Sequence, residues 1–221
     1  MLKKLLVSLL SALLCISVVA EPESQLNGTQ NVSDAKIDEN GDVFVSPLKY
    51  HISSDSTAEV IRDDSYKKLE SVVIPSEIRV DGHVYSVTII GNDAFRGCSG
   101  LRSIEIPSSV TSIGVWSFCG CGGLTSIEIP SSVTSIGNSA FRDCSGFTNV
   151  IISSSVTSIG KFAFWGCRGL TSIEIPSSVT NIGGGAFYRC ENLEIVIDNS
   201  KENISVGENA FYGCKSVKFL K

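Results

Sequence analysis

The sequence predicts a β-rich repeat solenoid of about six stacked coils with short helical turns and an N-terminal β cap. Six cysteines recur at intervals of 23 residues, with one final interval of 24: Cys98, Cys121, Cys144, Cys167, Cys190 and Cys214. A phenylalanine precedes each of them by three residues, and a glycine precedes each by seven. A fixed period of roughly 20 to 50 residues is typical of solenoids, in which every repeat is one supersecondary unit.

The repeat over residues 124–146 indicates how one coil is built. Apolar and polar residues alternate at its start. This alternation predicts a short strand that Pro130 ends, because proline cannot donate a hydrogen bond to a sheet. Gly137 is expected to permit a sharp corner of the backbone. Phe141 and Cys144 follow at the spacing of one helical turn, so both are expected to point inward. Stacked copies would bury these side chains as continuous columns.

The repeat pattern L-x-x-I-x-I-P-x-x-V-x-x-I-G-x-x-A-F-x-x-C resembles the BspA-like class of leucine-rich repeat. That class is found in surface and secreted proteins of bacteria and of some parasitic protists. The resemblance covers the chain from Leu69 to about Ser216, with nearly every position of the motif filled. It implies a right-handed leucine-rich-repeat-like solenoid and a role in adhesion or ligand binding at the cell surface.

The chain is expected to divide into four parts. Residues 1–20 resemble a secretory signal peptide, because two lysines precede an apolar run that is too short to span a bilayer. The alternatives are an uncleaved anchor and a lipid attached at Cys15. Residues 21–41 are rich in Asn, Ser, Asp and Gln and are expected to be a flexible leader. Residues 42–68 are expected to form an N-terminal capping hairpin, and residues 69–221 the solenoid.

The solenoid is expected to contain six repeats and the beginning of a seventh, over residues 69–100, 101–123, 124–146, 147–169, 170–192, 193–216 and 217–221. The first repeat is longer because residues 78–86 are inserted into it. Asp81-Gly82 lies in this insertion between alternating apolar residues, which predicts a β-hairpin with a two-residue turn.

Charge narrows the classes of partner. Without residues 1–20 the chain has 16 basic and 23 acidic residues, a net charge of −7. Binding to a nucleic-acid backbone requires clustered lysine and arginine, so no nucleic-acid partner is expected. An acidic chain favours cationic or neutral partners. After signal cleavage no segment is expected to span a membrane, so the protein is expected to be secreted or held at the cell surface.

The first candidate binding surface is the outer side of the first strand of each repeat. Polar and acidic residues recur there, and stacked carboxylates would repel one another unless a cation or a basic partner neutralised them. The alternative is a solvated polar face without a ligand. The residues expected on this strand face are Ser103, Glu105, Ser126, Glu128, Asn149, Ser172 and Glu174.

The second candidate surface is the column of residues that directly follow the repeat phenylalanines: Arg96, Cys119, Arg142, Trp165, Tyr188 and Tyr212. Tyrosine, tryptophan and arginine are the residue types that dominate binding hot spots. The alternative is that these side chains only pack on one another. Cys119 is expected to face outward as an exposed thiol. Such a thiol either pairs with another chain or has no function.

No constellation of catalytic or metal-binding residues is recognisable. His51 and His83 lie in the cap without a metal-ligand spacing. The run Gly183–Gly185 lacks the spacing and the lysine of a phosphate-binding loop, so it is expected to be an ordinary corner of the repeat. The cysteines of the column are expected to be buried free thiols rather than disulfides. Neither a cofactor nor a metal ion is therefore expected.

The expected function is binding rather than catalysis. The chain is predicted to be a secreted or cell-surface repeat protein that binds protein or cell-surface ligands, as an adhesion or interaction module. The alternative is a structural stalk or matrix component whose copies associate end to end.

Overall fold

The computed structural model describes residues 29–32, 36–53 and 56–221. The expected signal peptide and Cys15 lie outside these residues. Within the described part of the chain, no helix is long and apolar enough to cross a membrane.

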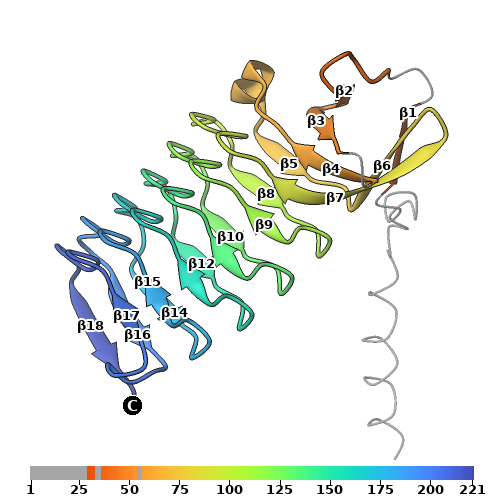
Figure 1. Ribbon diagram of the computed structural model, residues 1–221. Helices are drawn as coiled ribbons and strands as arrows, with labels where there is room; N and C mark the ends of the chain where they lie inside the picture. The colour runs from red at the N-terminus through yellow and green to blue at the C-terminus, as the bar shows by residue number, and fades with distance from the viewer. Residues whose placement is uncertain (1–28, 33–35, 54–55) are drawn as a thin grey trace, which may run out of the picture.

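Each coil of the solenoid contributes two short strands, and equivalent strands of neighbouring coils run parallel in an arc of coils (Figure 1). The first strands form the strand face: β5 (Ser71–Val73), β8 (Ser103–Glu105), β10 (Ser126–Glu128), β12 (Asn149–Ile151), β14 (Ser172–Ile175), β16 (Glu194–Ile197) and β18 (Ser216–Phe219). The second strands form another face: β9 (Ser112–Ile113), β11 (Ser135–Ile136), β13 (Ser158–Ile159), β15 (Asn181–Ile182) and β17 (Ser205–Val206). The predicted β-rich solenoid is confirmed.

Helical structure is a minor part of the fold. The helix among the described residues is a short 3-10 helix, η1 (Asp64–Lys68). The segments that carry the repeat phenylalanines and cysteines are hydrogen-bonded turns, in which, for example, the Cys144 N–H donates to the Phe141 carbonyl at 3.3 Å. The expected short helical turns are therefore tight turns that do not continue into helices.

The two faces differ in how continuously their strands are paired. The second strands belong to one sheet that runs from β17 through β15, β13, β11 and β9 to the N-terminal region. The strand face is divided into three separate ladders, β5–β8, β10–β12 and β14–β16–β18. Two seams therefore cross the strand face, one between β8 and β10 and one between β12 and β14.

The N-terminal region extends the continuous sheet beyond the first coil. Strands β2 (Asp42–Val45), β3 (Leu48–Ile52) and β4 (Thr57–Val60) are antiparallel, and β4 pairs in parallel with β7 (His83–Ile90) of the first coil. The sequence suggested a two-stranded hairpin over 42–68, whereas the structure has three strands and η1 there. The strand that the hairpin interpretation missed is β2, which pairs with β3 on the side away from β4 and the first coil.

The insertion in the first repeat supplies most of one further strand, and another strand pairs with it. Strand β6 (Glu77–Val80) pairs antiparallel with β7, and Val80 lies opposite His83 across a two-residue turn. Asp81 and Gly82 in this turn have φ angles of +50° and +78°. Positive φ at both central residues is the geometry that Asp-Gly hairpin turns favour, so the predicted hairpin is confirmed. Strand β1 (Thr29–Val32), within the expected leader, pairs in parallel with β6.

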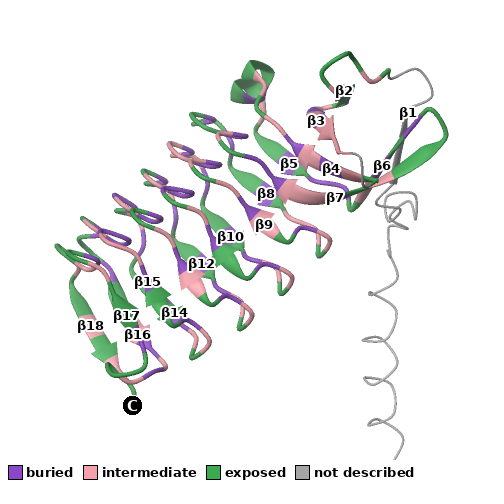
Figure 2. Ribbon diagram, in the orientation of Figure 1, coloured by how far each residue is buried: buried purple, intermediate pink, exposed green. Residues whose placement is uncertain are grey.

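The core consists of buried columns that run through all the coils (Figure 2). From Phe95 to Phe187 the rings of the repeat phenylalanines stack with centroids 5.2–5.3 Å apart. At the last coil the Phe187–Phe211 distance grows to 6.1 Å, and Phe211 is only half-buried. Each ring of the inner coils therefore packs against a ring on both sides, which is favourable for large apolar groups.

The column thiols connect successive coils. Each thiol donates to the carbonyl oxygen of the repeat phenylalanine in the preceding coil, at 3.0–3.1 Å, from Cys121 to Cys214. The cysteines that the structure describes are all free, and five of them are buried. Burial raises the pKa of the donating thiols, to about 11 for Cys214, so they remain protonated at neutral pH.

The repeat glycine at the corner of each coil is required by close approach of two backbones. The sequence predicted that Gly137 permits a sharp corner of the backbone, yet its φ is not positive. A Cβ atom on Gly137 would instead lie 2.7 Å from the backbone of Gly114 in the preceding coil. The left-handed conformation occurs two residues later, with φ between +55° and +62°, at Asp93, Trp116, Ser139, Phe162, Gly185 and Asn209.

Truncation of a central ring is expected to destabilise the fold strongly. Replacing Phe141 by alanine should lower the free energy of unfolding by about 3–5 kcal/mol, because the cavity lies between two neighbouring rings. Replacing Phe211 by alanine should cost distinctly less, since this ring is half-buried at the last described coil. Urea titration of both variants measures the difference, and equal losses would contradict a core stacked from both sides.

Ser117 is expected to be a weak point of the core. It is fully buried at the position where the other repeats have alanine, and its hydroxyl has no hydrogen-bond partner among the described residues. Because a buried unsatisfied hydroxyl is unfavourable, Ser117→Ala should raise the free energy of unfolding by about 1 kcal/mol. Ser126→Ala, at an exposed position, should leave it unchanged. A loss of stability in Ser117→Ala would show that this hydroxyl does have a partner.

Thiol titration is expected to separate the cysteines by burial. In the native protein the half-buried Cys119 and Cys214 should react with a thiol reagent, while the five buried cysteines should not. Unfolding without reductant should release all five, because no disulfide holds them. The measurement is labelling followed by mass spectrometry, with and without denaturant. Release of fewer than five would mean that some of these cysteines pair in solution.

Candidate functional site

The residues predicted on the strand face are all exposed. Inward and outward side chains alternate along each strand, with Ile127 buried between Ser126 and Glu128. In-register pairing then brings equivalent residues of neighbouring coils together, Ser126 opposite Asn149 and Glu128 opposite Ile151. The strand face therefore displays two polar rows, which Ile151 interrupts with an exposed apolar side chain.

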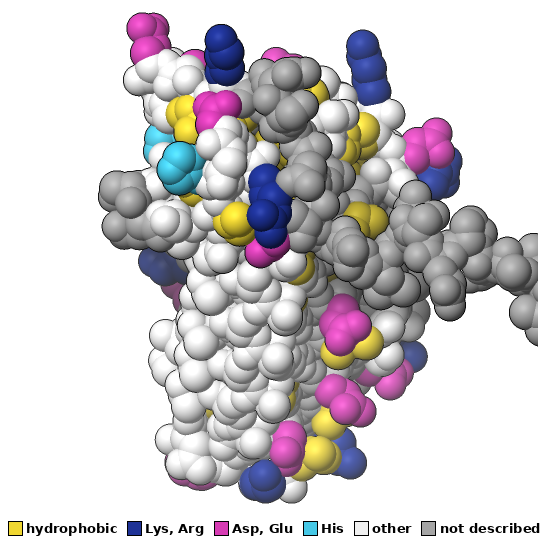
Figure 3. Space-filling view, turned by 90° about the vertical axis from the view of Figure 1, so that its right-hand side faces the viewer, with side chains coloured by type: hydrophobic (Ala, Val, Ile, Leu, Met, Phe, Trp, Pro, Cys, Tyr) yellow, Lys and Arg dark blue, Asp and Glu magenta, His cyan; other side chains and the backbone are white. Residues whose placement is uncertain are grey.

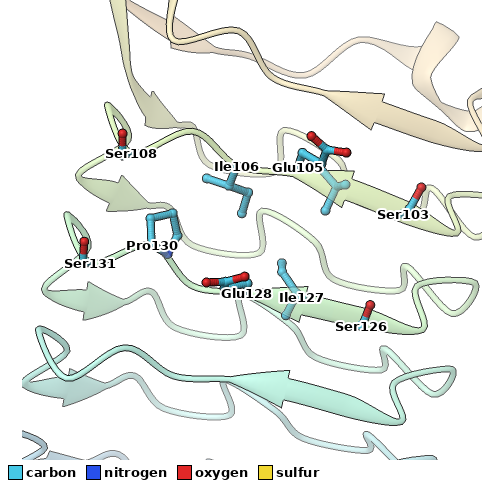
Figure 4. A pocket seen from close by; sticks show the side chains of 10 residues that line it. Ser103, Glu105, Ile106, Ser108, Ser126, Ile127, Glu128, Pro130 and Ser131 are labelled. Atoms are coloured by element: carbon cyan, nitrogen blue, oxygen red, sulfur yellow. The ribbon is translucent and has the colours of Figure 1, made fainter. Parts of the chain in front are cut away.

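A pocket of about 570 Å³ lies at the seam between β8 and β10 (Figure 4). Its apolar surface comes from isoleucines and a proline of the two strands and the residues after them: Ile104, Ile106, Ile127 and Pro130. The carboxylates of Glu105 and Glu128 flank this surface, and serines lie at both ends of the pocket. The site thus combines an apolar floor with two acidic groups.

A second, smaller pocket of about 360 Å³ lies at the other seam. It is lined by residues of β12, β14 and β16, among them Asn149, Ile151, Ser172 and Glu174. The sequence placed these residues on one surface but gave no sign of the seam between β8 and β10, because the strands on either side of it have the same sequence.

Some acidic side chains of the strand face are paired with lysines, and others are not. In the last coil Glu194 lies 2.7 Å from the Lys215 ammonium group, and Asp198 lies 2.8 Å from that of Lys221. Glu105, Glu128 and Glu174 form no ion pair with any other described residue. The pocket between β8 and β10 therefore has two carboxylates that no described residue pairs with.

Four members of the aromatic and arginine column form a continuous stack. The Arg142 guanidinium lies 4.0 Å from the centre of the Trp165 ring, a cation–π contact. The Trp165–Tyr188 and Tyr188–Tyr212 ring centroids are 6.3 and 5.0 Å apart, with interplanar angles of 16° and 17°. Because the rings cover one another's faces, mainly their edges are available to a ligand. Tyr212, the last ring, is 61% exposed.

The other two members of the column lie outside this stack. Arg96 places its guanidinium 4.3 Å from the ring centre of Trp116, which is not part of the column. Cys119, expected to be exposed, is half-buried. Burial raises the pKa of its thiol, and the nearby Asp143 acts in the same direction, against Arg96 and Arg142. Its thiolate is therefore disfavoured at neutral pH.

The described residues contain no group of three or more histidines, cysteines or acids that could hold a metal ion. Histidine side chains lie on the N-terminal region, above a largely uncharged side of the solenoid (Figure 3). His51 lies 3.0 Å from the Asp42 carboxylate, which also contacts Lys49 at 2.9 Å. His83 lies 3.1 Å from the Asp81 carbonyl oxygen. These contacts hold turns and strands of the cap together.

Comparison with known proteins places the chain in a family. The model of the BspA type leucine rich repeat region matches residues 64–194 and 187–221, with six copies of the repeat. No curated protein matches the chain. Among solved structures, a leucine-rich repeat protein of T. pallidum is 28% identical with a TM-score of 0.61. That similarity covers 78% of this chain and 82% of the other.

Two other solved structures share the fold at lower identity. A leucine-rich repeat protein from Eubacterium ventriosum is 23% identical with a TM-score of 0.58, over 79% of this chain and 50% of that protein. The pneumococcal vaccine antigen PcpA is 20% identical with a TM-score of 0.54, over 78% of this chain and 51% of that one. The chain thus spans about half the length of both. It belongs to the BspA-type leucine-rich repeat family, as its repeat motif predicts.

Proposed function

We propose that the chain is a protein-binding module and that its strand face takes a basic segment of a partner protein. The observation that carries this proposal is the pair of carboxylates, Glu105 and Glu128, which flank an apolar pocket without any ion-pair partner among the described residues. The predicted signal peptide and the resemblance of the repeats favour a place outside the cell or at its surface. Binding rather than catalysis is the proposed role.

The pocket suits a lysine or arginine side chain. Such a side chain has an apolar stem and a charged head, so the stem can lie on Ile106 and Ile127 while the head reaches a carboxylate. Hydrogen bonds between a cation and a carboxylate are stronger than those between neutral groups. An acidic or purely apolar segment would leave the carboxylates unpaired in a partly desolvated contact, which is unfavourable.

The two seams suggest a spacing for the basic residues. The seams are two coils apart, and parallel strands stack at roughly 4.8 Å, so the pockets are about 10 Å from each other. An extended peptide advances about 3.3 Å per residue. A segment lying along the stack would therefore reach Glu128 and Glu174 with basic residues about three positions apart.

A labelled peptide tests this proposal. An extended peptide with lysine at every third position and serine or glycine between should bind, as measured by fluorescence anisotropy, and a peptide with glutamate in place of lysine should not. Glu128→Gln should weaken binding of the lysine peptide about five-fold, roughly 1 kcal/mol. Added salt should weaken binding further, because exposed charges are screened.

Glu202→Gln is the matched control, because it removes the same charge from an exposed turn away from the pocket. It should leave the affinity for the lysine peptide nearly unchanged. Equal weakening by Glu128→Gln and Glu202→Gln would mean that only the overall negative charge attracts the peptide. In that case the strand-face site would be refuted. End-to-end association of copies stays a prediction, which sedimentation at increasing concentration decides.

A further inference from the structure

The corner of the fifth coil lacks side chains that the other coils carry. Two residues follow the repeat glycine at each corner, and they are Asn138 and Ser139 in the third coil and Lys161 and Phe162 in the fourth. In the fifth coil both are glycines, Gly184 and Gly185. A pocket of about 470 Å³ opens at this place, within the usual range of small-molecule sites of roughly 300–1,000 Å³.

One wall of this pocket is an exposed aromatic ring in a strained conformation. Phe162 has a φ of +57° and is 44% exposed. Left-handed backbone is rare for a bulky side chain, and the repeat imposes it at this position of every coil. The ring lies over the next coil, where a Cβ atom on Gly185 would come within 2.5 Å of its Cε1 atom. The position of the ring therefore depends on the glycine.

Tyr188 contributes a second, rigid ring to the lining. It is held between Trp165 and Tyr212 in the aromatic stack, at centroid distances of 6.3 and 5.0 Å. A ligand that contacts Tyr188 would not have to order a mobile side chain, which lowers the entropic cost of binding. The aromatic column thus supports a pocket beside it, although its own ring faces are largely covered.

A lining residue of the pocket, Glu208, has a backbone amide that lacks the hydrogen bond made at two other corners. At two other corners an asparagine side chain accepts a hydrogen bond from the equivalent amide of the next coil. Asn92 Oδ1 lies 2.7 Å from the Val115 nitrogen, and Asn138 Oδ1 lies 2.8 Å from the Lys161 nitrogen. Gly184 cannot do the same for the Glu208 N–H, which has no hydrogen bond to any described residue. An oxygen of a ligand would take the place of the asparagine amide.

The polar groups at the rim balance one another in charge. Lys161 and Glu208 carry opposite charges, and the Asn209 amide donates to Glu208 at 3.2 Å. This bond leaves one carboxylate oxygen and the asparagine carbonyl available as acceptors, beside the ammonium and backbone donors. A neutral ligand with many groups that both donate and accept fits this set better than an ion does.

We propose that this pocket binds a neutral carbohydrate. A pyranose has an apolar face of C–H bonds, which suits the negative face of the Phe162 ring, and hydroxyls around its rim. One hydroxyl would accept from the Glu208 N–H, and its neighbours would bond to Glu208, Asn209 and Lys161. The site shares no lining residue with the pocket between β8 and β10, so it is a second binding function that does not depend on the strand face.

Titration with neutral oligosaccharides tests the proposal. Cellotetraose, maltotetraose and chitotetraose are added to the chain, and binding is followed by calorimetry and by saturation-transfer NMR. At least one of them should bind, and Phe162→Ala should lower its affinity at least ten-fold. Gly184→Asn should do the same by filling the pocket. It introduces the residue that stands at the equivalent corner as Asn138, so the fold should be kept, which thermal unfolding checks.

Two control variants separate this site from the rest of the surface. Trp116→Ala removes the aromatic residue at the same left-handed position of the second coil and should leave oligosaccharide binding unchanged. Glu128→Gln should also leave it unchanged, so that failure of the strand-face proposal does not affect this one. Three outcomes would overturn the carbohydrate site: no binding of any of the three sugars, equal losses in Phe162→Ala and Trp116→Ala, or sugar displaced by an extended glycine-serine peptide.

Discussion

In-register stacking of the coils is the constraint on which the rest of the solenoid depends, and the hydrogen bond from each column thiol from Cys121 to Cys214 to the phenylalanine carbonyl of the preceding coil forms within it. Five such bonds of 3.0–3.1 Å join the coils from Cys121 to Cys214. A thiol is small enough to be buried beside a phenylalanine ring and can still donate. The bond forms only when equivalent residues lie in register. It therefore ties the repeat length to the stacking of the phenylalanine rings.

Register in turn explains which positions are uniform and which can vary. A backbone held this close to its neighbour leaves no room for a Cβ atom at Gly137, and the Phe141 ring must meet a ring on either side. Residues on the outside meet no such constraint, so charge and shape change there from coil to coil. Binding surfaces of solenoids arise from this freedom, because each coil contacts mainly its neighbours.

Both proposed sites lie where polar groups lack a partner that the equivalent groups have in another coil of the solenoid. At the seam of the strand face, β8 and β10 lack the ladder that joins β10 to β12, and Glu105 and Glu128 lack the lysine partners present in the last coil. At the fifth corner Gly184 lacks the amide that Asn138 supplies. In each case polar groups remain unsatisfied beside apolar surface. Such groups give a ligand both orientation and affinity.

The sequence by itself determined how one coil is built, because the alternation of apolar and polar residues and the 23-residue period indicate which side chains point inward. It also determined the Asp81-Gly82 hairpin and the exposure of the strand-face residues. Only the tertiary structure decided where the sheet divides, because Ser103–Glu105 and Ser126–Glu128 have the same sequence and yet are not paired. It also decided that Phe162 lies over a glycine of the next coil. The spacing between neighbouring coils depends on how the twist of the sheet accumulates over the whole stack. The sequence of a single repeat does not contain this information.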